Sequence, residues 1–308
     1  MNNILIAENI TKTYGDFTAL NDVSIAIPKQ SVFGLLGPNG AGKTSLIRII
    51  NQITLPDSGQ IILDGRPLQL DDVANIGYLP EERGLYKSMK VGEQALYLAQ
   101  LKGMSKQDAK KALKMWFDKF EIGSWWDKKI EELSKGMAQK VQFITTVMHQ
   151  PKLLIFDEPF SGFDPVNANL IKDEILALRD QGATVIFSTH RMESVEEMCD
   201  NIALIDKSNK ILDGKLSEIK KSFRSNSFEI GLEVNGDSSA IYNEIANQFS
   251  ASKSDLKLLD DTLTFSVQLK DEKPNELIQY LSQKGNMIHF VEKIPSVNDI
   301  FIQAVSKK

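Results

Sequence analysis

An eight-residue loop at residues 37–44 limits what this chain can fold into more than any other feature. It reads Gly-Pro-Asn-Gly-Ala-Gly-Lys-Thr and fits the pattern G-x-x-x-x-G-K-[ST] in full. An apolar run, Ser31–Leu36, precedes the loop, and a helical pattern, Thr44–Ile50, follows it. Glycines let the backbone wrap with its N–H groups turned inward, towards phosphate, and the helix start adds its positive dipole end. The loop therefore predicts a nucleoside triphosphate site on a strand–loop–helix unit.

The chain alternates short β-rich runs with helical stretches up to about residue 215, the pattern of an α/β domain. Compact apolar runs are typical of parallel strands buried on both faces, because helices cover both sides of such a sheet. We expect a P-loop nucleoside triphosphatase fold in a first domain at residues 1–222. The expected strands are Ile4–Ile10, Val23–Ile27, Ser31–Leu36, Leu153–Phe156 and Thr184–Phe187, with a turn at Tyr14-Gly15-Asp16.

Residues 88–150 differ from the rest of this domain, because they carry helical periodicity with few strand signals. Val91–Leu101, Lys106–Phe120 and Lys135–His149 predict a helical subdomain inserted between strands. Its basic helical face is expected to comprise Lys102, Lys106, Lys110, Lys111 and Lys114. That face is either a solvated surface or a region attracted to a membrane surface or an acidic partner.

A stretch rich in lysine and serine, Lys215–Ser227, is expected to link to a second, smaller domain at residues 223–308. Patterns alternate there in the order β-α-β-β-α-β, which predicts a ferredoxin-like α+β domain without a catalytic constellation. The expected elements are Phe228–Val234, Ile241–Phe249, Leu256–Leu259, Thr262–Leu269, Pro274–Gln283, Met287–Val291 and a final helix Val297–Val305, with a hairpin turn at Asp260-Asp261.

The apolar run Leu153–Phe156 ends in two carboxylates, Asp157 and Glu158. A buried strand would deliver Asp157 to the carboxyl edge of the sheet, where ligands of open α/β sheets bind, and there it would ligate Mg²⁺. Glu158 projects differently and would polarise an attacking water. Lys43 would reach the β- and γ-phosphates, and the Thr44 hydroxyl would be a second Mg²⁺ ligand. Such a carboxylate pair alone is often solvated surface, but beside a phosphate loop it indicates hydrolysis.

Three further segments narrow the family of phosphate-loop proteins. The segment 133–137, Leu-Ser-Lys-Gly-Met, opens a helix ahead of that strand; residues 161–164, Ser-Gly-Phe-Asp, follow it; and His190 ends the next apolar run. In this order, together with the phosphate loop, they resemble the nucleotide-binding subunits of ATP-binding cassette (ABC) transporters over residues 4–215. In that family the three segments are the signature motif, the D-loop and the switch histidine.

The resemblance implies roles for individual positions. The residues expected to bind ATP are Tyr14, which would stack on adenine, and Gly37, Pro38, Asn39, Gly40, Ala41, Gly42, Lys43, Thr44 and Ser45. Glu158 would be the catalytic base, and His190 would contact the γ-phosphate. The signature residues Ser134, Lys135, Gly136 and Met137 would act on ATP held by a second subunit, and the D-loop residues are Ser161, Gly162 and Asp164. The resemblance therefore implies a homodimer, or a paired cassette, that forms on ATP binding.

Two motifs depart from the family pattern. The usual signature reads Leu-Ser-Gly-Gly-Gln, but Lys135 and Met137 replace its first glycine and its glutamine here, whereas Ser134 is kept. Glu81 stands where the family commonly has a glutamine that ligates Mg²⁺. A carboxylate oxygen can still ligate this hard cation, at the price of one more negative charge beside the triphosphate. The segments around Glu81 and Ser134 resemble the export branch that includes sodium and antibiotic efflux systems.

Composition limits the setting in which such a chain works. The 308 residues carry a net charge of −5, which gives no reason to expect a nucleic-acid partner. No apolar run approaches the ~18 residues of a membrane span, and the N-terminus lacks the pattern of a signal peptide. The one cysteine, Cys199, excludes an internal disulfide. We expect a cytoplasmic ATPase, peripheral on the inner face of the membrane, that drives an integral membrane permease on a separate chain, with export as its direction.

Two other functions are considered. A soluble ABC-type ATPase acting on ribosomes or DNA is the alternative, although such chains usually carry two cassettes or a long coiled-coil insertion, and neither is visible. A GTPase is rejected, because Asn209–Leu212 lacks the aspartate that a guanine-reading Asn/Thr-Lys-x-Asp motif needs. His149 and His289 have no motif context and are expected to be structural or surface residues. The sequence does not name the cargo, because the permease selects it.

Overall fold

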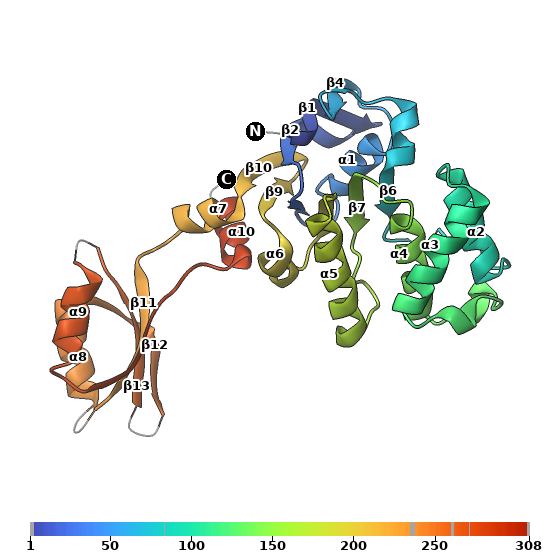
Figure 1. Ribbon diagram of the computed structural model, residues 1–308. Helices are drawn as coiled ribbons and strands as arrows, with labels where there is room; N and C mark the ends of the chain where they lie inside the picture. Colours follow the sequence, from blue (N-terminus) through green and yellow to red (C-terminus); the bar gives the residue numbers. More distant parts are fainter. Residues whose placement is uncertain (1–2, 83, 235–237, 260–261, 271, 307–308) are drawn as a thin grey trace. The chain divides into compact units, whose positions relative to one another are not determined.

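The computed structural model describes residues 3–82, 84–234, 238–259, 262–270 and 272–306 (Figure 1). The chain divides into two compact units, Met1–Leu216 with Ala304–Lys308, and Ser217–Gln303. Each unit has its own cluster of buried apolar side chains, so each is described by itself.

A six-stranded sheet runs through the first unit in the order β10-β9-β3-β8-β7-β6. Its strands are parallel except at the β10 edge, and every side chain of β3, β7 and β8 is buried, as expected for strands covered on both faces. Leu36 pairs with Thr189, and Asp157 pairs with Ser188, so the phosphate loop and the carboxylates leave the sheet at one edge. The strands are β3 (Val32–Leu36), β6 (Ile76–Leu79), β7 (Leu153–Asp157), β8 (Thr184–Thr189), β9 (Asn201–Asp206) and β10 (Asn209–Lys215).

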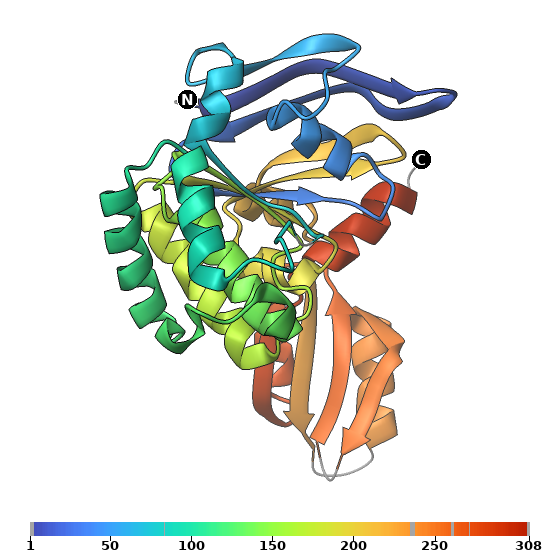
Figure 2. The ribbon, with the colours of Figure 1, turned by 90° about the vertical axis from the view of Figure 1, so that its right-hand side faces the viewer.

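A second, antiparallel sheet has the order β2-β1-β4-β5 and lies at the top of Figure 2. Its strands are β1 (Asn3–Tyr14), β2 (Phe17–Pro28), β4 (Ser58–Leu63) and β5 (Arg66–Pro67). The first two run further than predicted, because backbone pairing continues through exposed residues such as Thr13 and its partner Thr18. The predicted turn is confirmed: Tyr14 pairs with Phe17, and Gly15 between them has φ 59°, which suits a glycine.

Helices follow the phosphate loop and fill the predicted helical region. They are α1 (Lys43–Ile50), α2 (Val91–Leu101), α3 (Lys106–Lys119), α4 (Lys135–Val147), α5 (Pro165–Asp180) and α6 (Met192–Met198), with short 3-10 turns η1 (Leu70–Asn75), η2 (Gly123–Trp125) and η3 (Ile130–Glu132). Aromatic rings join the helical region to the sheet: Trp116 lies edge-on to Phe143, which stacks on Phe156 of β7 with 5.7 Å between ring centroids. This contact anchors α3 and α4 to the strand that carries Asp157.

One residue of the expected basic face lies elsewhere. Lys102 is half-buried, and its ammonium donates hydrogen bonds to the carbonyls of Val73 and Ile76, both at 2.8 Å. Its assignment to the basic helical face was wrong, because α2 ends at Leu101 and the side chain then turns back towards η1 and β6. The other members of that face, Lys106, Lys110, Lys111 and Lys114, are exposed along α3.

The second unit is the predicted ferredoxin-like domain. Its sheet order, β12-β13-β11-β14, with all neighbours antiparallel, is that of a split β-α-β unit, and α8 and α9 lie on the same face of it in Figures 1 and 2. The elements are β11 (Ser227–Glu233), α8 (Ser238–Gln248), β12 (Ser250–Leu259), β13 (Thr262–Gln268), α9 (Pro274–Leu281) and β14 (Asn286–Glu292). The last helix, α10 (Val297–Ser306), begins in this unit, and its residues from Ala304 onward are counted with the first unit. β12 begins at Ser250 rather than Leu256, and the predicted turn at Asp260-Asp261 lies outside the described residues.

The expected linker Lys215–Ser227 contains the division between the two units, which falls after Leu216, and it also contains a helix. Helix α7 (Leu216–Ser222) occupies it, and Phe223–Asn226 connects α7 to β11. Leu216 and Ile219, three residues apart, bury their side chains on one face of this helix. Two buried apolar residues are too weak a pattern to predict a helix of seven residues from the sequence.

Candidate active site

The phosphate loop has a backbone that only glycine permits at two positions. Gly37 has φ 147° and Gly42 has φ 116°. A Cβ on Gly37 would fall 2.0 Å from the carbonyl oxygen of Ile205, and one on Gly42 would fall 2.2 Å from that of Ala19. The loop therefore lies directly against the backbone of β9 and β2, where a side chain at either position would clash.

The turn between β9 and β10 is hydrogen-bonded to this loop. Ser208 donates its backbone N–H to the Ala41 carbonyl at 3.2 Å and accepts from the backbone N–H of Asn21 at 2.8 Å. Its hydroxyl donates to the carbonyl of Thr18. The turn thus ties the phosphate loop to β2, the strand that begins at Phe17.

A cavity of about 280 Å³ opens above the loop. Its lining brings together three parts of the chain that the sequence predicted to meet: the loop, Glu81, and the pair Asp157 and Glu158. The loop residues that line it are Asn39, Gly40, Gly42, Lys43, Thr44 and Ser45. Gly37, Pro38 and Ala41 shape the loop without lining the cavity, and the ammonium of Lys43 donates to the carbonyls of Gly37 at 2.7 Å and Pro38 at 3.0 Å.

An aromatic residue that sequence reasoning missed also lines the cavity. Phe17 does so, whereas its cross-strand partner Tyr14 is not among the lining residues and lies 45% exposed. The ammonium of Lys12 lies 5.4 Å from the centre of the Tyr14 ring. The pairing of Tyr14 with Phe17 across a two-residue turn was the available signal, because it puts two aromatic rings at one hairpin tip. The expected adenine contact of Tyr14 stays a prediction.

The cavity lining has more carboxylates, from Glu81, Asp157 and Glu158, than cations, which it has from Lys43. Burial raises the pKa of Asp157, and the nearby carboxylates of Glu158 and Glu81 raise it further, against hydrogen bonding from Ser188 and the charge of Lys43. Burial lowers the pKa of Lys43, although the same carboxylates oppose that shift. Crowded negative charge of this kind favours a bound cation.

The oxygen donors at this point fit Mg²⁺ only in part. Among the described residues, no cluster of three His, Cys, Asp or Glu side chains is close enough to hold a metal ion by itself. The hydroxyl of Thr44 and the carboxylates of Asp157 and Glu81 are hard oxygen ligands, which suit Mg²⁺. This cation usually completes its shell with substrate phosphates and water, so a partial protein shell fits a metal that arrives with a triphosphate.

Glu158 and His190 meet because their strands are neighbours. The carboxylate of Glu158 is buried; its Oε1 accepts from the backbone N–H of His190 at 2.8 Å and lies 2.6 Å from Nδ1 of the same residue. Thr189 donates its hydroxyl to Oε2 at 3.1 Å. The backbone of Glu158 has φ 50°, a left-handed conformation that is uncommon outside glycine and here turns the chain sharply after β7.

The signature residues lie apart from this cavity. Ser134 is the N-cap of α4, where its hydroxyl accepts from the backbone N–H of Met137 at 3.3 Å, and none of residues 134–137 lines the cavity. They contact the D-loop instead: a Cβ on Gly162 would fall 2.2 Å from Cε of Lys135, and the amide of Gln139 donates to the carbonyl of Ser161.

The last D-loop residue has a structural task in this chain. Asp164 caps α5, because its Oδ1 accepts from the backbone N–H groups of Val166 and Asn167, each at 3.0 Å. Hydrogen bonds from the backbone and side chain of Asn167 hold the pKa of Asp164 below its usual value. The aspartate therefore fixes where the D-loop ends and α5 begins.

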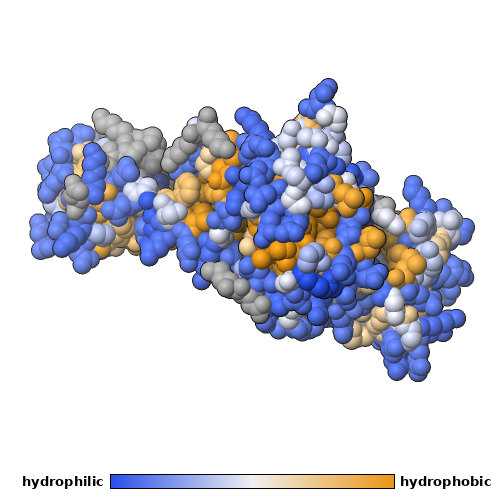
Figure 3. Space-filling view, turned by 90° about the horizontal axis from the view of Figure 1, so that it is seen from above, coloured by the Kyte–Doolittle hydropathy of each residue, from blue (hydrophilic) through white to orange (hydrophobic). Residues whose placement is uncertain are grey.

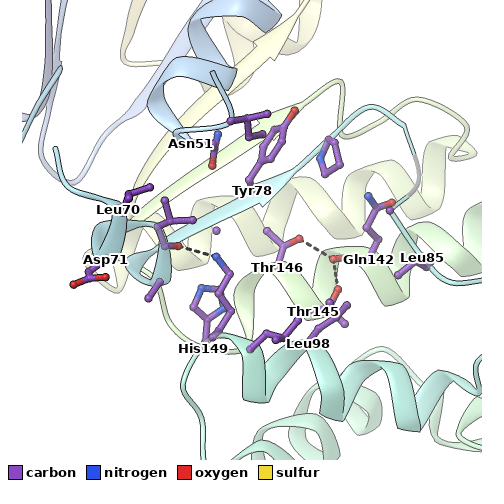
Figure 4. A pocket seen from close by; sticks show the side chains of 18 residues that line it. Asn51, Leu70, Asp71, Tyr78, Leu85, Leu98, Gln142, Thr145, Thr146 and His149 are labelled. Carbon is purple, nitrogen blue, oxygen red and sulfur yellow. Dashed lines mark hydrogen bonds between the residues drawn. The ribbon is translucent and has the colours of Figure 1, made fainter. Parts of the chain in front are cut away.

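A larger cavity of about 680 Å³ lies between η1, β6, α2 and α4 (Figure 4). Apolar side chains such as Leu70, Leu98 and Leu101 line it, and Pro80 extends it to the residue before Glu81. We call it the α2–α4 groove. Leu70 and Leu101 are 74% and 63% exposed. The face drawn in Figure 3 is largely hydrophilic, with hydrophobic surface gathered near its middle. At its floor, burial and the neighbouring Lys102 lower the pKa of His149 to about 4.

Comparison with known proteins decides the family. The family model described as "ABC transporter" matches residues 20–161. An ABC transporter ATP-binding protein of Bacillus subtilis, YhaQ, is 42% identical over 304 residues, which cover 98% of this chain and 98% of that protein. The chain belongs to the ATP-binding subunits of ABC transporters. Members of this family hydrolyse ATP to power transport and work with separate membrane permease components.

The similarity of this ABC ATPase extends over both units. A family model described as the C-terminal domain of DrrA1-3-like ATP-binding proteins matches residues 214–305. Nod factor export ATP-binding protein I of Cupriavidus metallidurans is 29% identical and covers 100% of this chain and 99% of its own length. Among solved structures, an ATP-binding subunit of an ABC transporter superposes with a TM-score of 0.67 at 26% identity, over 71% of this chain and 93% of that one. The resemblance seen in the sequence is thereby confirmed.

Proposed function

We propose that this ABC ATPase powers export, and that it does so as a Mg²⁺-dependent dimer on the cytoplasmic face of a membrane. The observation that carries the proposal is the convergence of Lys43, Asp157 and Glu158 on one cavity, with His190 bound to Glu158 at its edge. A relative named for Nod factor export, similar over the full length, favours export as the direction. The relatives named above give no support to the alternative of a ribosome- or DNA-acting ATPase.

The cavity residues divide the work of hydrolysis. The ammonium of Lys43 and the backbone N–H groups of the loop bind the phosphates of ATP. Thr44, Asp157 and Glu81 are the residues that would hold Mg²⁺, which offsets phosphate charge when bound. Glu158 accepts a proton from the attacking water, and His190 orients that carboxylate and contacts the γ-phosphate. Phe17 and Tyr14 supply aromatic surface for the adenine at the hairpin tip.

A second cassette completes the site. One chain places Ser134 and its neighbours away from its own cavity, at the N-terminus of α4, where backbone N–H groups and the helix dipole favour a phosphate. A partner arranged head-to-tail would bring that helix start to the γ-phosphate held by Lys43. Stabilisation of the transferring phosphoryl group is then shared between two chains, which makes hydrolysis depend on dimerisation.

The α2–α4 groove is the surface that supports a contact with the permease. No helix among the described residues is long and apolar enough to cross a membrane. The groove is apolar, exceeds the ATP cavity in volume, and shares Pro80 with the segment that carries Glu81. A permease segment bound in the groove would be coupled to the ATP site through the stretch around Pro80 and Glu81. Binding there would also hold the ATPase at the membrane.

Where a neighbouring gene encodes a multi-span membrane protein, coexpression of that protein with this chain tests the proposal. We expect the pair to copurify, Leu101→Arg in the groove to abolish copurification, and ATP hydrolysis by the isolated variant to stay at the wild-type rate. Met115→Arg is the matched control, because Met115 is 55% exposed on α3 outside the groove. Copurification that survives Leu101→Arg would refute the docking surface. ATP-driven uptake of cargo by inside-out vesicles would support export, and uptake only by right-side-out vesicles would contradict it.

A further inference from the structure

Among the residues that the structure describes, the hydrogen bonds to the carboxylate of Glu158 come from one dipeptide, Thr189-His190. His190 contacts Oε1 twice, through its backbone N–H at 2.8 Å and its ring Nδ1 at 2.6 Å. Thr189 contacts Oε2 through its hydroxyl at 3.1 Å. The family pattern names the histidine, but Thr189 read in the sequence only as one more residue at the end of an apolar strand.

The hydroxyl of Thr189 has a fixed direction. A threonine hydroxyl has one proton to donate and accepts through its lone pairs. The backbone N–H of Arg191 donates to Oγ1 of Thr189 at 3.0 Å, so this oxygen already acts as an acceptor towards α6. Its own proton is then directed to Oε2 of Glu158. Thr189 is only 2% exposed, and therefore water does not compete for that hydrogen bond.

The strand register holds Thr189 in place from two sides. Thr189 pairs with Leu36, the last residue before the phosphate loop, and the preceding Ser188 accepts from the backbone N–H of Glu158 at 2.9 Å. The threonine thus lies between β3, which leads into the phosphate loop, and Glu158, the residue that follows β7. Its hydroxyl links the position of the base to the position of the phosphates.

We propose that Thr189 is a positioning residue for Glu158, and that its hydroxyl orients Oε2 towards the attacking water. The inference rests on the proposed role of Glu158 as the base. With Oε1 in contact with His190 twice, the acceptor capacity that remains for water lies mainly on Oε2, whose orientation depends on Thr189. The side chain of His190 is 55% exposed, so its ring can turn to a phosphate while Thr189 and the backbone N–H of His190 keep the carboxylate in place.

The test compares two buried threonines of the same strand. Thr189→Val keeps the branched shape and removes the hydroxyl, and Thr189→Ser keeps the hydroxyl. Thr184→Val is the matched control, because Thr184 is 1% exposed at the other end of β8 and its hydroxyl accepts from the backbone N–H of Gln30 at 2.9 Å. Thr184→Val removes a hydroxyl that accepts from a backbone N–H group, as the hydroxyl of Thr189 accepts from Arg191, but it does so far from Glu158. If Thr189→Val does not fold, Thr189→Ala and Thr189→Ser give the same comparison.

We expect Thr189→Val to lower kcat for MgATP about 10- to 100-fold, because a small misplacement of a base has effects of that order. The KM for ATP should stay within about threefold, since the phosphate loop is untouched, and Thr189→Ser should restore kcat to within about threefold. Equal losses of kcat in Thr189→Val and Thr184→Val would overturn the proposal in favour of a purely structural role. A normal rate for Thr189→Val beside an inactive Glu158→Gln would also overturn it, whereas an active Glu158→Gln would overturn the base assignment itself.

Discussion

The side chain of Lys135 lies across Gly162, so that a Cβ on this glycine would fall 2.2 Å from the lysine Cε. One turn further along α4, Gln139 donates to the carbonyl of Ser161. Two side chains of the signature helix therefore hold the D-loop from within the same chain. The lysine replaces a glycine of the usual signature, and a glycine there would have no side chain to make this contact.

Removal of this contact is expected to slow ATP hydrolysis. Lys135→Ala and Gly162→Ala should each lower the rate several-fold, because each separates the helix start from the D-loop. Only Gly162→Ala should also destabilise the fold, by about 1–2 kcal/mol, since φ at this position is 91° and a Cβ is strained there. ATPase assays and urea unfolding measure the two effects. A wild-type rate for Lys135→Ala would show that only the backbone conformation of the D-loop matters.

The two aromatic residues at the β1–β2 turn should differ in their effect on nucleotide binding. Stacking of a base on an aromatic ring contributes about 1–3 kcal/mol, so the loss of the ring that holds adenine should raise the KM for ATP roughly 5- to 100-fold. Phe17 lines the cavity, and we expect Phe17→Ala to have the larger effect. Steady-state kinetics of Phe17→Ala and Tyr14→Ala decide between them. A large effect for Tyr14→Ala alone would return the adenine site to the position that the family resemblance indicates.

Glu81 should govern the requirement for Mg²⁺. Glu81→Gln should retain ATP binding, because an amide oxygen can replace a carboxylate oxygen as ligand, whereas Glu81→Ala should raise the Mg²⁺ concentration for half-maximal activity several-fold. Glu82→Ala is the control, since Glu82 is exposed beside Glu81 and does not line the cavity. Titration of activity with Mg²⁺ measures the change. Identical titrations for wild type and Glu81→Ala would leave Glu81 as a solvated loop residue.

Glu158→Gln should trap the dimer. The glutamine keeps the size of the side chain but removes the base, which contributes typically ~10²–10⁴-fold to the rate. ATP that is bound and not consumed stabilises the state that binds it, so size-exclusion chromatography with ATP and Mg²⁺ should show a dimer for the variant and mainly monomer for wild type. Adding Ser134→Arg should suppress the shift by steric and charge conflict. A dimer that persists in the double variant would contradict the placement of Ser134 at the partner's ATP.

His149 should make the fold sensitive to mild acid. Its pKa is lowered from 6.5 to about 4 by burial and by Lys102, so the unfolded chain binds a proton that the folded chain does not. Stability from this group is present above pH 6.5 and is lost as the pH falls towards 4. Between pH 7.5 and pH 5 the loss is about 2 kcal/mol. Urea unfolding at both pH values should show a smaller loss for His149→Gln; equal losses would show that other groups carry the pH dependence.

The sequence alone predicted those parts of the site whose chemistry leaves few choices of residue. Gly37 and Gly42 adopt backbone conformations next to carbonyl groups that exclude a side chain, so the loop pattern is both rare and specific. Asp157 follows a strand that is apolar throughout, because helices cover both of its faces. The ferredoxin-like order of the second unit was also readable, since each of its elements keeps a clear period.

Other features depended on tertiary contacts that leave no local pattern. Lys102 was predicted to belong to the basic helical face. Its side chain instead turns back at the end of α2 and donates to the carbonyls of Val73 and Ile76. Phe17 reaches the cavity only because a two-residue turn sets it opposite Tyr14. Thr189 is indistinguishable in sequence from a threonine that packs in a strand, and its role follows from the register of β8 with β3 and from the turn of the chain at Glu158.

The turn at Ser208 has a consequence for the size of the molecule that fits this site. It joins the phosphate loop, through Ala41, to Thr18 and Asn21 on β2, which starts at Phe17. The span from the aromatic hairpin tip to the phosphate loop is therefore fixed by the protein and not by what occupies it. A ligand that fills the site must therefore carry its aromatic ring and its terminal phosphate at one fixed separation. A nucleotide with a shorter phosphate chain cannot contact both the hairpin tip and the full phosphate loop.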